Sequence, residues 1–102
     1  MKTKVTRSIG NVFEDLGFPR EEADHLKIRS ALMIHLGKVI EAKGLKQAEA
    51  AKMLGVTQPR ISDLLQGKIH LFSIDTLVEM LAHAGVRVKL VVSPSKRKLK
   101  VA

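Results

Sequence analysis

Apolar side chains recur at every third or fourth position between residues 20 and 43, with polar side chains between them. This period is that of an α-helix that buries one face. Pro19 favours a helix start, and the acidic Glu21 and Glu22 suit the positive end of the helix dipole. Gly44 favours the end of the helix. The pattern therefore predicts one long helix over about 20–43.

Three shorter helical segments follow, and each is closed by a glycine, which accepts a left-handed backbone easily. Thr57 and Ser73 are hydroxyl residues suited to cap a helix, and Pro59 lies in the first turn after Thr57. We expect these helices at 47–54, at 57–66 and from 73 to the glycine at 85.

After residue 85 the period changes from helical to alternating. Val86, Val88, Leu90 and Val92 occupy every second position, as on one face of a β-strand, and Pro94 ends the run. A lone strand leaves its backbone groups unpaired, so we expect these four residues to form a dimer interface in which the strand pairs antiparallel with that of a second copy. The alternative is addition of the strand to the sheet of another protein.

Composition excludes several classes of protein. The 102 residues fit one domain, without an internal repeat or a linker rich in Gly, Pro or Ser. The absence of cysteine excludes disulfide scaffolds, zinc fingers and thiol catalysis. Aromatic residues are 3% of the chain, too few for base-stacking platforms. No apolar run approaches the roughly 18 residues that span a bilayer, so we expect a cytoplasmic protein without membrane contact.

The positive charge is concentrated at the two ends of the chain. The net charge is +8, yet the region 8–86 is almost neutral. Nine basic residues lie outside that region: Lys2, Lys4, Arg7, Arg87, Lys89, Lys96, Arg97, Lys98 and Lys100. Basic ends on a neutral body indicate arms that follow the phosphates of a nucleic acid. The alternative is that the ends are only solvated.

Residues 47–66 form the most informative segment. Two short helices separated by about three residues are the helix-turn-helix arrangement. Ala51 is small enough for a close approach of the two helices, and Gly55 suits the tight turn. At about 100° per residue, Ile61, Leu64 and Leu65 fall on one side of the second helix. The residues expected to point away from them are Pro59, Arg60, Ser62, Asp63 and Gln66. Such a polar face fits the major groove of DNA, where Arg suits guanine and Gln suits adenine.

The segment GLKQAEAAKMLGVTQPRISDLLQGK, at 44–68, resembles the helix-turn-helix of the phage-repressor-like family, the XRE or Cro/C1 type. The segments NVFEDLGFP (11–19) and HLFSIDTLVEMLAHAGVRVKLVV (70–92) are similar to a subgroup of small bacterial XRE proteins that includes HigA-like antitoxins. The resemblance covers about 10–93. It implies a sequence-specific DNA-binding regulator, or in the alternative an antitoxin that neutralises a RelE/HigB-like toxin and represses its own operon.

The resemblance also implies roles for single residues. Gln47 corresponds to a glutamine that holds a phosphate and supports the recognition helix, and Gln58 to the first base-reading position. Lys68 follows the recognition helix where a phosphate contact is common. Pro59 and Asp63 depart from the family pattern, since a carboxylate only accepts hydrogen bonds, for example from cytosine. The alternative for Asp63 is an intramolecular pair with Arg60.

Other chemistry is not predicted. His25, His35, His70 and His83 have no metal-ligand spacing, and Asp75 and Glu79 lie near a helix start, where they serve the dipole and solubility. Glycine-rich phosphate loops and nucleophile motifs are absent from the sequence. We therefore expect no enzymatic activity, no cofactor and no metal.

Together, these patterns predict a mostly α-helical, phage-repressor-like bundle of four to five helices with one C-terminal strand. We divide the chain into an N-terminal arm (1–18), a helix-turn-helix DNA-binding domain (19–85), a dimerisation strand (86–93) and a basic tail (94–102). The expected function is a dimeric transcriptional regulator, a repressor of a palindromic operator. The residues predicted to contact double-stranded DNA are Gln47, Thr57, Gln58, Pro59, Arg60, Ser62, Asp63, Gln66 and Lys68.

Overall fold

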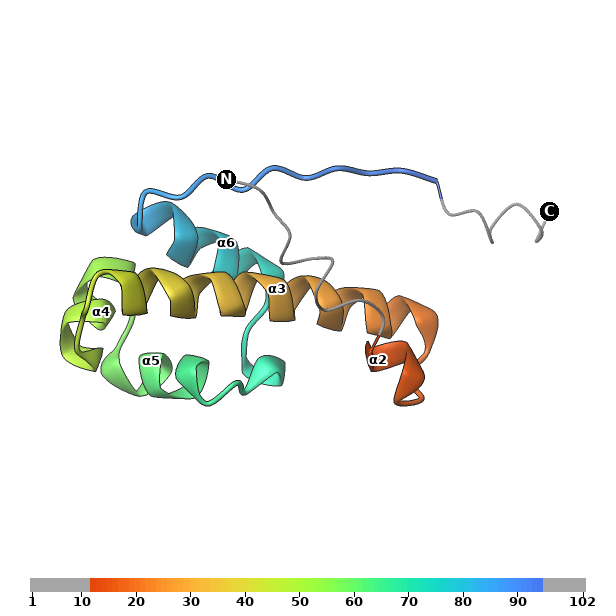
Figure 1. The fold of residues 1–102 in the computed structure, drawn as a ribbon, viewed down its shortest axis with the longest axis horizontal. Helices are drawn as coiled ribbons and strands as arrows, with labels where there is room; N and C mark the ends of the chain where they lie inside the picture. The colour runs from red at the N-terminus through yellow and green to blue at the C-terminus, as the bar shows by residue number, and fades with distance from the viewer. Residues whose placement is uncertain (1–11, 95–102) are drawn as a thin grey trace.

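The long helix α3 (Arg20–Ala42) runs the length of the bundle, and the shorter helices lie along it (Figure 1). The computed structural model describes residues 12–94. Pro19 precedes the first residue of α3, and Glu21 and Glu22 lie in its first turn. The helix ends one residue before the predicted end, so the prediction of one long helix is confirmed.

The other described helices are short. They are α2 (Val12–Asp15), α4 (Gln47–Leu54), α5 (Gln58–Leu65), the 3₁₀ turn η1 (Ile69–Leu71) and α6 (Ile74–His83). The helices α5 and α6 lie on opposite sides of α3, and α4, at the C-terminal end of α3, packs against both of them (Figure 1). The helices predicted at 47–54, 57–66 and from 73 are confirmed, with ends within about two residues of the prediction.

One hydrophobic core joins α3, α4, α5 and α6. Its largest fully buried side chains come from every one of these helices and from the residue that follows η1. They are Leu36, Leu54, Ile61, Phe72, Leu77, Met80 and Leu81. The core is largely aliphatic because the chain has only three phenylalanines and no tyrosine or tryptophan. It holds the two helices of the helix-turn-helix unit in a fixed position on α3.

A side-chain hydrogen bond caps the start of α6, as predicted, but the cap that we predicted at the start of α5 is absent. The Ser73 hydroxyl accepts a hydrogen bond from the Thr76 N–H at 3.1 Å, which confirms Ser73 as the cap of α6. Thr57 occupies the N-cap position of α5, but its side chain makes no capping hydrogen bond. At α4 the Glu49 carboxylate accepts from the Lys46 N–H at 2.8 Å. The first turn of α5 therefore depends on packing rather than on a hydroxyl cap.

The described parts of the two chain ends add detail to what the sequence predicts. The region assigned to an N-terminal arm contains the one-turn helix α2, and the Phe13 and Phe18 rings lie edge to face with their centroids 6.2 Å apart. Residues 86–94 of the single chain form no β-ladder with other described residues. The strand predicted there was expected to pair with a second copy, so it stays a prediction. The basic positions in 1–11 and 95–102 lie outside the described residues.

Candidate nucleic-acid interface

The turn between α4 and α5 is built on Gly55, which has a left-handed backbone with φ of 72°. The next residue, Val56, donates its N–H to the Ala51 carbonyl at 3.0 Å and closes the end of α4. Ala50 and Ala51 are both buried, and their small size permits the close approach of α5. These contacts fix the angle between α4 and α5, as the sequence predicts for a helix-turn-helix.

The buried face of α5 is narrower than we predicted. Ile61 is fully buried and Leu64 is nearly so, but Leu65 is 47% exposed. The prediction that Leu65 packs with the other two is therefore wrong. Its position at the edge of the apolar face places it on a shallow surface groove that Phe13 and Ile34 also line.

The opposite face of α5 is open to solvent. Exposed side chains at its start come from Thr57, Gln58 and Pro59, and Gln66 is exposed just beyond its end. Gln47, the first residue of α4, is exposed as well. Most of the polar residues that the sequence assigned to DNA are therefore exposed, and Ser62 and Asp63 are half-buried. One further residue, Arg60, is an exception described below.

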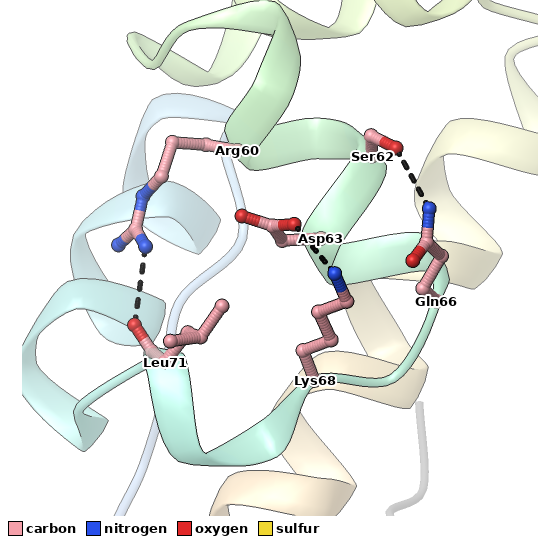
Figure 2. A network of polar contacts seen from close by, with 6 residues as sticks. All are labelled: Arg60, Ser62, Asp63, Gln66, Lys68 and Leu71. Atoms are coloured by element: carbon pink, nitrogen blue, oxygen red, sulfur yellow. Dashed lines mark hydrogen bonds and ion pairs between the residues drawn. The ribbon is translucent and has the colours of Figure 1, made fainter.

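Two polar pairs organise the second half of this face (Figure 2). The Gln66 amide donates to the Ser62 hydroxyl at 3.0 Å. The Lys68 ammonium lies 3.5 Å from a carboxylate oxygen of Asp63. The ion pair that the structure gives Asp63 is thus with Lys68 and not with Arg60, the intramolecular partner considered from the sequence. Both pairs are partly exposed, so the pairing energy is small and the side chains remain available to a ligand.

Arg60 is the exception on this helix. Figure 2 shows Arg60 and Ser62 projecting from opposite sides of α5. The Arg60 guanidinium lies 4.3 Å from the centroid of the Phe72 ring, and its Nη1 donates to the Leu71 carbonyl at 3.1 Å. Residues four apart lie on the same side of a helix, so Arg60 follows the side of Leu64 and not the side of Gln58. The predicted contact of Arg60 with a base stays a prediction.

The partner of Arg60 was not identified from the sequence. Phe72 is 1% exposed and immediately precedes the Ser73 cap, while Leu77 lies four residues after the cap in the same core cluster. An apolar residue just before a helix cap commonly packs against the fourth residue of the helix. This spacing is the signal that predicts burial of Phe72, although it does not predict that Arg60 lies over the ring.

The residues predicted to form the dimer interface separate into two groups. Val86 and Val88 are half-buried and pack against the core. Leu90 and Val92 are 77% and 91% exposed. The first half of the segment is therefore anchored to its own chain, and the second half offers apolar side chains and unpaired backbone to another molecule.

Comparison with known proteins supports this description. A protein-family model described as a helix-turn-helix domain matches residues 12–93. A solved chain whose name places it in the XRE family of transcriptional regulators shares 32% sequence identity with this chain, over 74% of this chain and 85% of its own length, with a TM-score of 0.68. Comparison with curated proteins gave no match.

The fold and the α4–turn–α5 unit define a helix-turn-helix protein. The chain belongs to the XRE family, and the predicted phage-repressor-like bundle is confirmed. This family consists of regulators, which supports the expectation that the chain is not an enzyme. In the described part of the chain, no helix has the length and apolar character needed to cross a membrane.

Proposed function

We propose that this protein is a dimeric transcriptional repressor that reads a palindromic operator with α5. The broader assignment, a regulator that binds double-stranded DNA, follows from its membership of the XRE helix-turn-helix family. The operator symmetry, the dimer and the direction of regulation are our proposal.

The exposed polar face of α5 is the observation that carries the proposal. Behind this face Ile61 and Leu64 are buried, so the helix is held rigidly while its outer side stays open. Gln58 presents an amide, which pairs well with adenine in the major groove. The methylenes of Pro59 suit the methyl group of thymine. Gln47 and Lys68 are exposed near the two ends of the unit, where contacts with phosphates fix the register.

A single α5 is too short to specify an operator. Eight residues of helix span about 12 Å and contact only a few base pairs. Two copies related by a two-fold axis, with their recognition helices about 34 Å apart, read two half-sites on one face of the duplex. The exposed segment around Leu90 and Val92 supports a dimer, because pairing with its counterpart in a second copy satisfies its backbone groups and covers its apolar side chains.

The same segment favours one second candidate function. Leu90, Val91 and Val92 are all largely exposed, and an extended apolar segment can also be added to the sheet edge of a partner protein. The second candidate is therefore an antitoxin that neutralises a RelE/HigB-like toxin by adding this segment to a sheet of the toxin, and that represses its own operon. In that case the homodimer contact is replaced by the toxin.

Selection of duplexes from a random DNA library by the full chain tests the proposal. We expect inverted repeats whose half-sites are centred about one helical turn apart. Sedimentation of the DNA-free protein at micromolar concentration is expected to give a dimer. A reporter with the selected site overlapping its promoter is expected to lose expression when the protein is present. Enrichment of single, unrepeated sites by a monomer would overturn the dimer and favour the second candidate.

A further inference from the structure

We propose that Arg60 is a positioning residue that fixes α5 against the connection between α5 and α6, and that it reads no base. The inference rests on the proposed role of α5 in reading DNA. In this proposal the one arginine of α5 contacts its own chain and not DNA.

Two contacts hold the Arg60 guanidinium in one orientation. Cζ of the guanidinium lies over the Phe72 ring, 4.3 Å from the ring centroid, and Nη1 donates to the Leu71 carbonyl at 3.1 Å. Arginine stacks on aromatic rings through its planar face and donates hydrogen bonds in that plane. Because two consecutive residues hold the guanidinium, movement of the side chain away from them breaks both contacts.

The groups that hold Arg60 belong to the fixed part of the fold. Phe72 is 1% exposed in the core that α5 and α6 share. Leu71 is the last residue of η1, and its N–H donates to the Lys68 carbonyl at 3.0 Å. The N–H of the next residue, Phe72, donates to the Ile69 carbonyl at 3.2 Å. Arg60 therefore ties the first turn of α5 to Leu71 and Phe72, which lie six and seven residues after Leu65, the last residue of α5.

The remaining polar residues of α5 differ from Arg60 in this respect. Ser62 pairs with Gln66, and Asp63 with Lys68, so these contacts stay within the exposed face. Gln58 is exposed at the start of the helix. To reach a base, Arg60 has to leave the Phe72 ring and the Leu71 carbonyl, whereas among the described residues none of the other five has a contact with the core to break. We therefore assign two different roles on α5: Arg60 sets the position of the helix, and the exposed residues read DNA.

Binding-site selection with R60A, R60K and Q58A distinguishes positioning from reading. R60A is expected to select the same preferred base at every position as the wild type, with affinity lower by about threefold to thirtyfold. Q58A, the matched control from the same helix turn, is expected to lose its preference at one base pair. Loss of preference at a single base pair in R60A overturns the proposal.

Lysine at position 60 distinguishes positioning from a phosphate contact. R60K keeps the charge but loses the planar stack, so its unfolding midpoint and its affinity for the selected duplex are expected to fall between those of the wild type and R60A. The slope of log affinity against log salt is expected to be unchanged in R60A. Full affinity in R60K, or a slope that falls by about one unit in R60A, assigns Arg60 to a phosphate and overturns the proposal.

Two measurements test the contact when no DNA sequence is selected or when R60A does not fold. In the wild-type chain, the NMR signals of the Arg60 side chain are expected to be shifted by the Phe72 ring, and to stay unchanged when duplex is added. A double-mutant cycle of R60K and F72L is expected to show non-additive loss of stability in the free protein. Additive effects, or an Arg60 signal that moves on DNA binding, overturn the proposal, whereas failure of selection alone overturns only the proposed function.

Discussion

A β-carbon added at Gly55 would lie 3.1 Å from Nε2 of His83. The two residues belong to the helix-turn-helix turn and to the last turn of α6. Nδ1 of His83 donates to the Glu79 carbonyl at 2.9 Å, since a carbonyl only accepts, and this bond orients the ring so that Nε2 faces Gly55. Two features therefore favour glycine at position 55: the left-handed backbone, and the His83 ring that a β-carbon would crowd.

Alanine at position 55 is expected to destabilise the protein more than alanine at position 67. Both glycines have a positive φ, 72° and 74°, but a β-carbon at Gly67 meets no atom within 4 Å. Gly67→Ala is expected to cost about 1–2 kcal/mol from backbone strain alone. Gly55→Ala is expected to cost about 1 kcal/mol more because the His83 ring has to move. Urea unfolding measures the free energy of unfolding of both variants. In a His83→Ala background the difference between the two variants is expected to disappear. Equal losses of stability in the wild-type background contradict this account.

The two hydroxyl N-caps are expected to contribute unequally to stability. The Ser73 hydroxyl accepts from the Thr76 N–H, whereas the Thr57 side chain makes no cap bond. Ser73→Ala is expected to lower the free energy of unfolding by about 1 kcal/mol. Thr57→Ala is expected to change it by less than about 0.5 kcal/mol. Denaturant titration compares the two variants, and a larger loss for Thr57→Ala is the result that speaks against the observed caps.

A charge at Leu90 is expected to convert the dimer to a monomer without unfolding the chain. Leu90 is 77% exposed, so glutamate there costs the free chain little, whereas Val88 is half-buried against the core and is a poorer site for the test. Leu90→Glu is expected to weaken binding to a selected operator far more than nonspecific binding. Leu16→Glu, at another exposed apolar residue (69%), is the control and is expected to leave the sedimentation of the dimer unchanged. A wild-type monomer at micromolar concentration contradicts the strand-pairing proposal.

Removal of the basic tail is expected to reduce the salt dependence of DNA binding. Deletion of 95–102 removes Lys96, Arg97, Lys98 and Lys100, which lie outside the described residues. Each lost phosphate contact is expected to lower the slope of log affinity against log salt by about one unit, with sequence preference unchanged. A variant with these four residues replaced by glutamine keeps the length of the tail and serves as the matched control. If the slope stays the same in both variants, the tail is only solvated.

Much of the helical framework could be predicted from the sequence because its signals are local. Apolar spacing and glycine positions gave the bounds of α3, α4, α5 and α6 to within about two residues. Ala51 and Gly55 predicted the close helix-turn-helix packing for steric reasons that involve only neighbouring residues. A strand, in contrast, needs a partner, so alternation over 86–92 could not by itself produce a ladder in one chain.

The orientation of single side chains on α5 was harder to predict. Arg60 was grouped from the sequence with the outward polar residues, although it lies four positions before the buried Leu64. Its contact with Phe72, twelve positions further along the chain, was not predicted. Leu65 was assigned to the buried half, yet its neighbours leave it 47% exposed. The packing around α5 depends on elements distant in sequence, so periodicity within α5 predicts neither the partner of Arg60 nor the exposure of Leu65.

The central claim, that the exposed face of α5 reads DNA bases, is tested most directly at Gln58. The measurement is equilibrium titration, by fluorescence anisotropy, of Gln58→Ala against the duplex selected by the wild type and against a scrambled duplex. The account predicts a loss of about 1–3 kcal/mol on the selected duplex and little change on the scrambled one, since the amide contacts a base and not the backbone. The control His25→Ala, at an exposed residue of α3 outside the helix-turn-helix unit and the segment 86–93, is expected to bind both duplexes as the wild type does. Equal affinity of Gln58→Ala and wild type for the selected duplex, with the fold intact by circular dichroism, would contradict the claim.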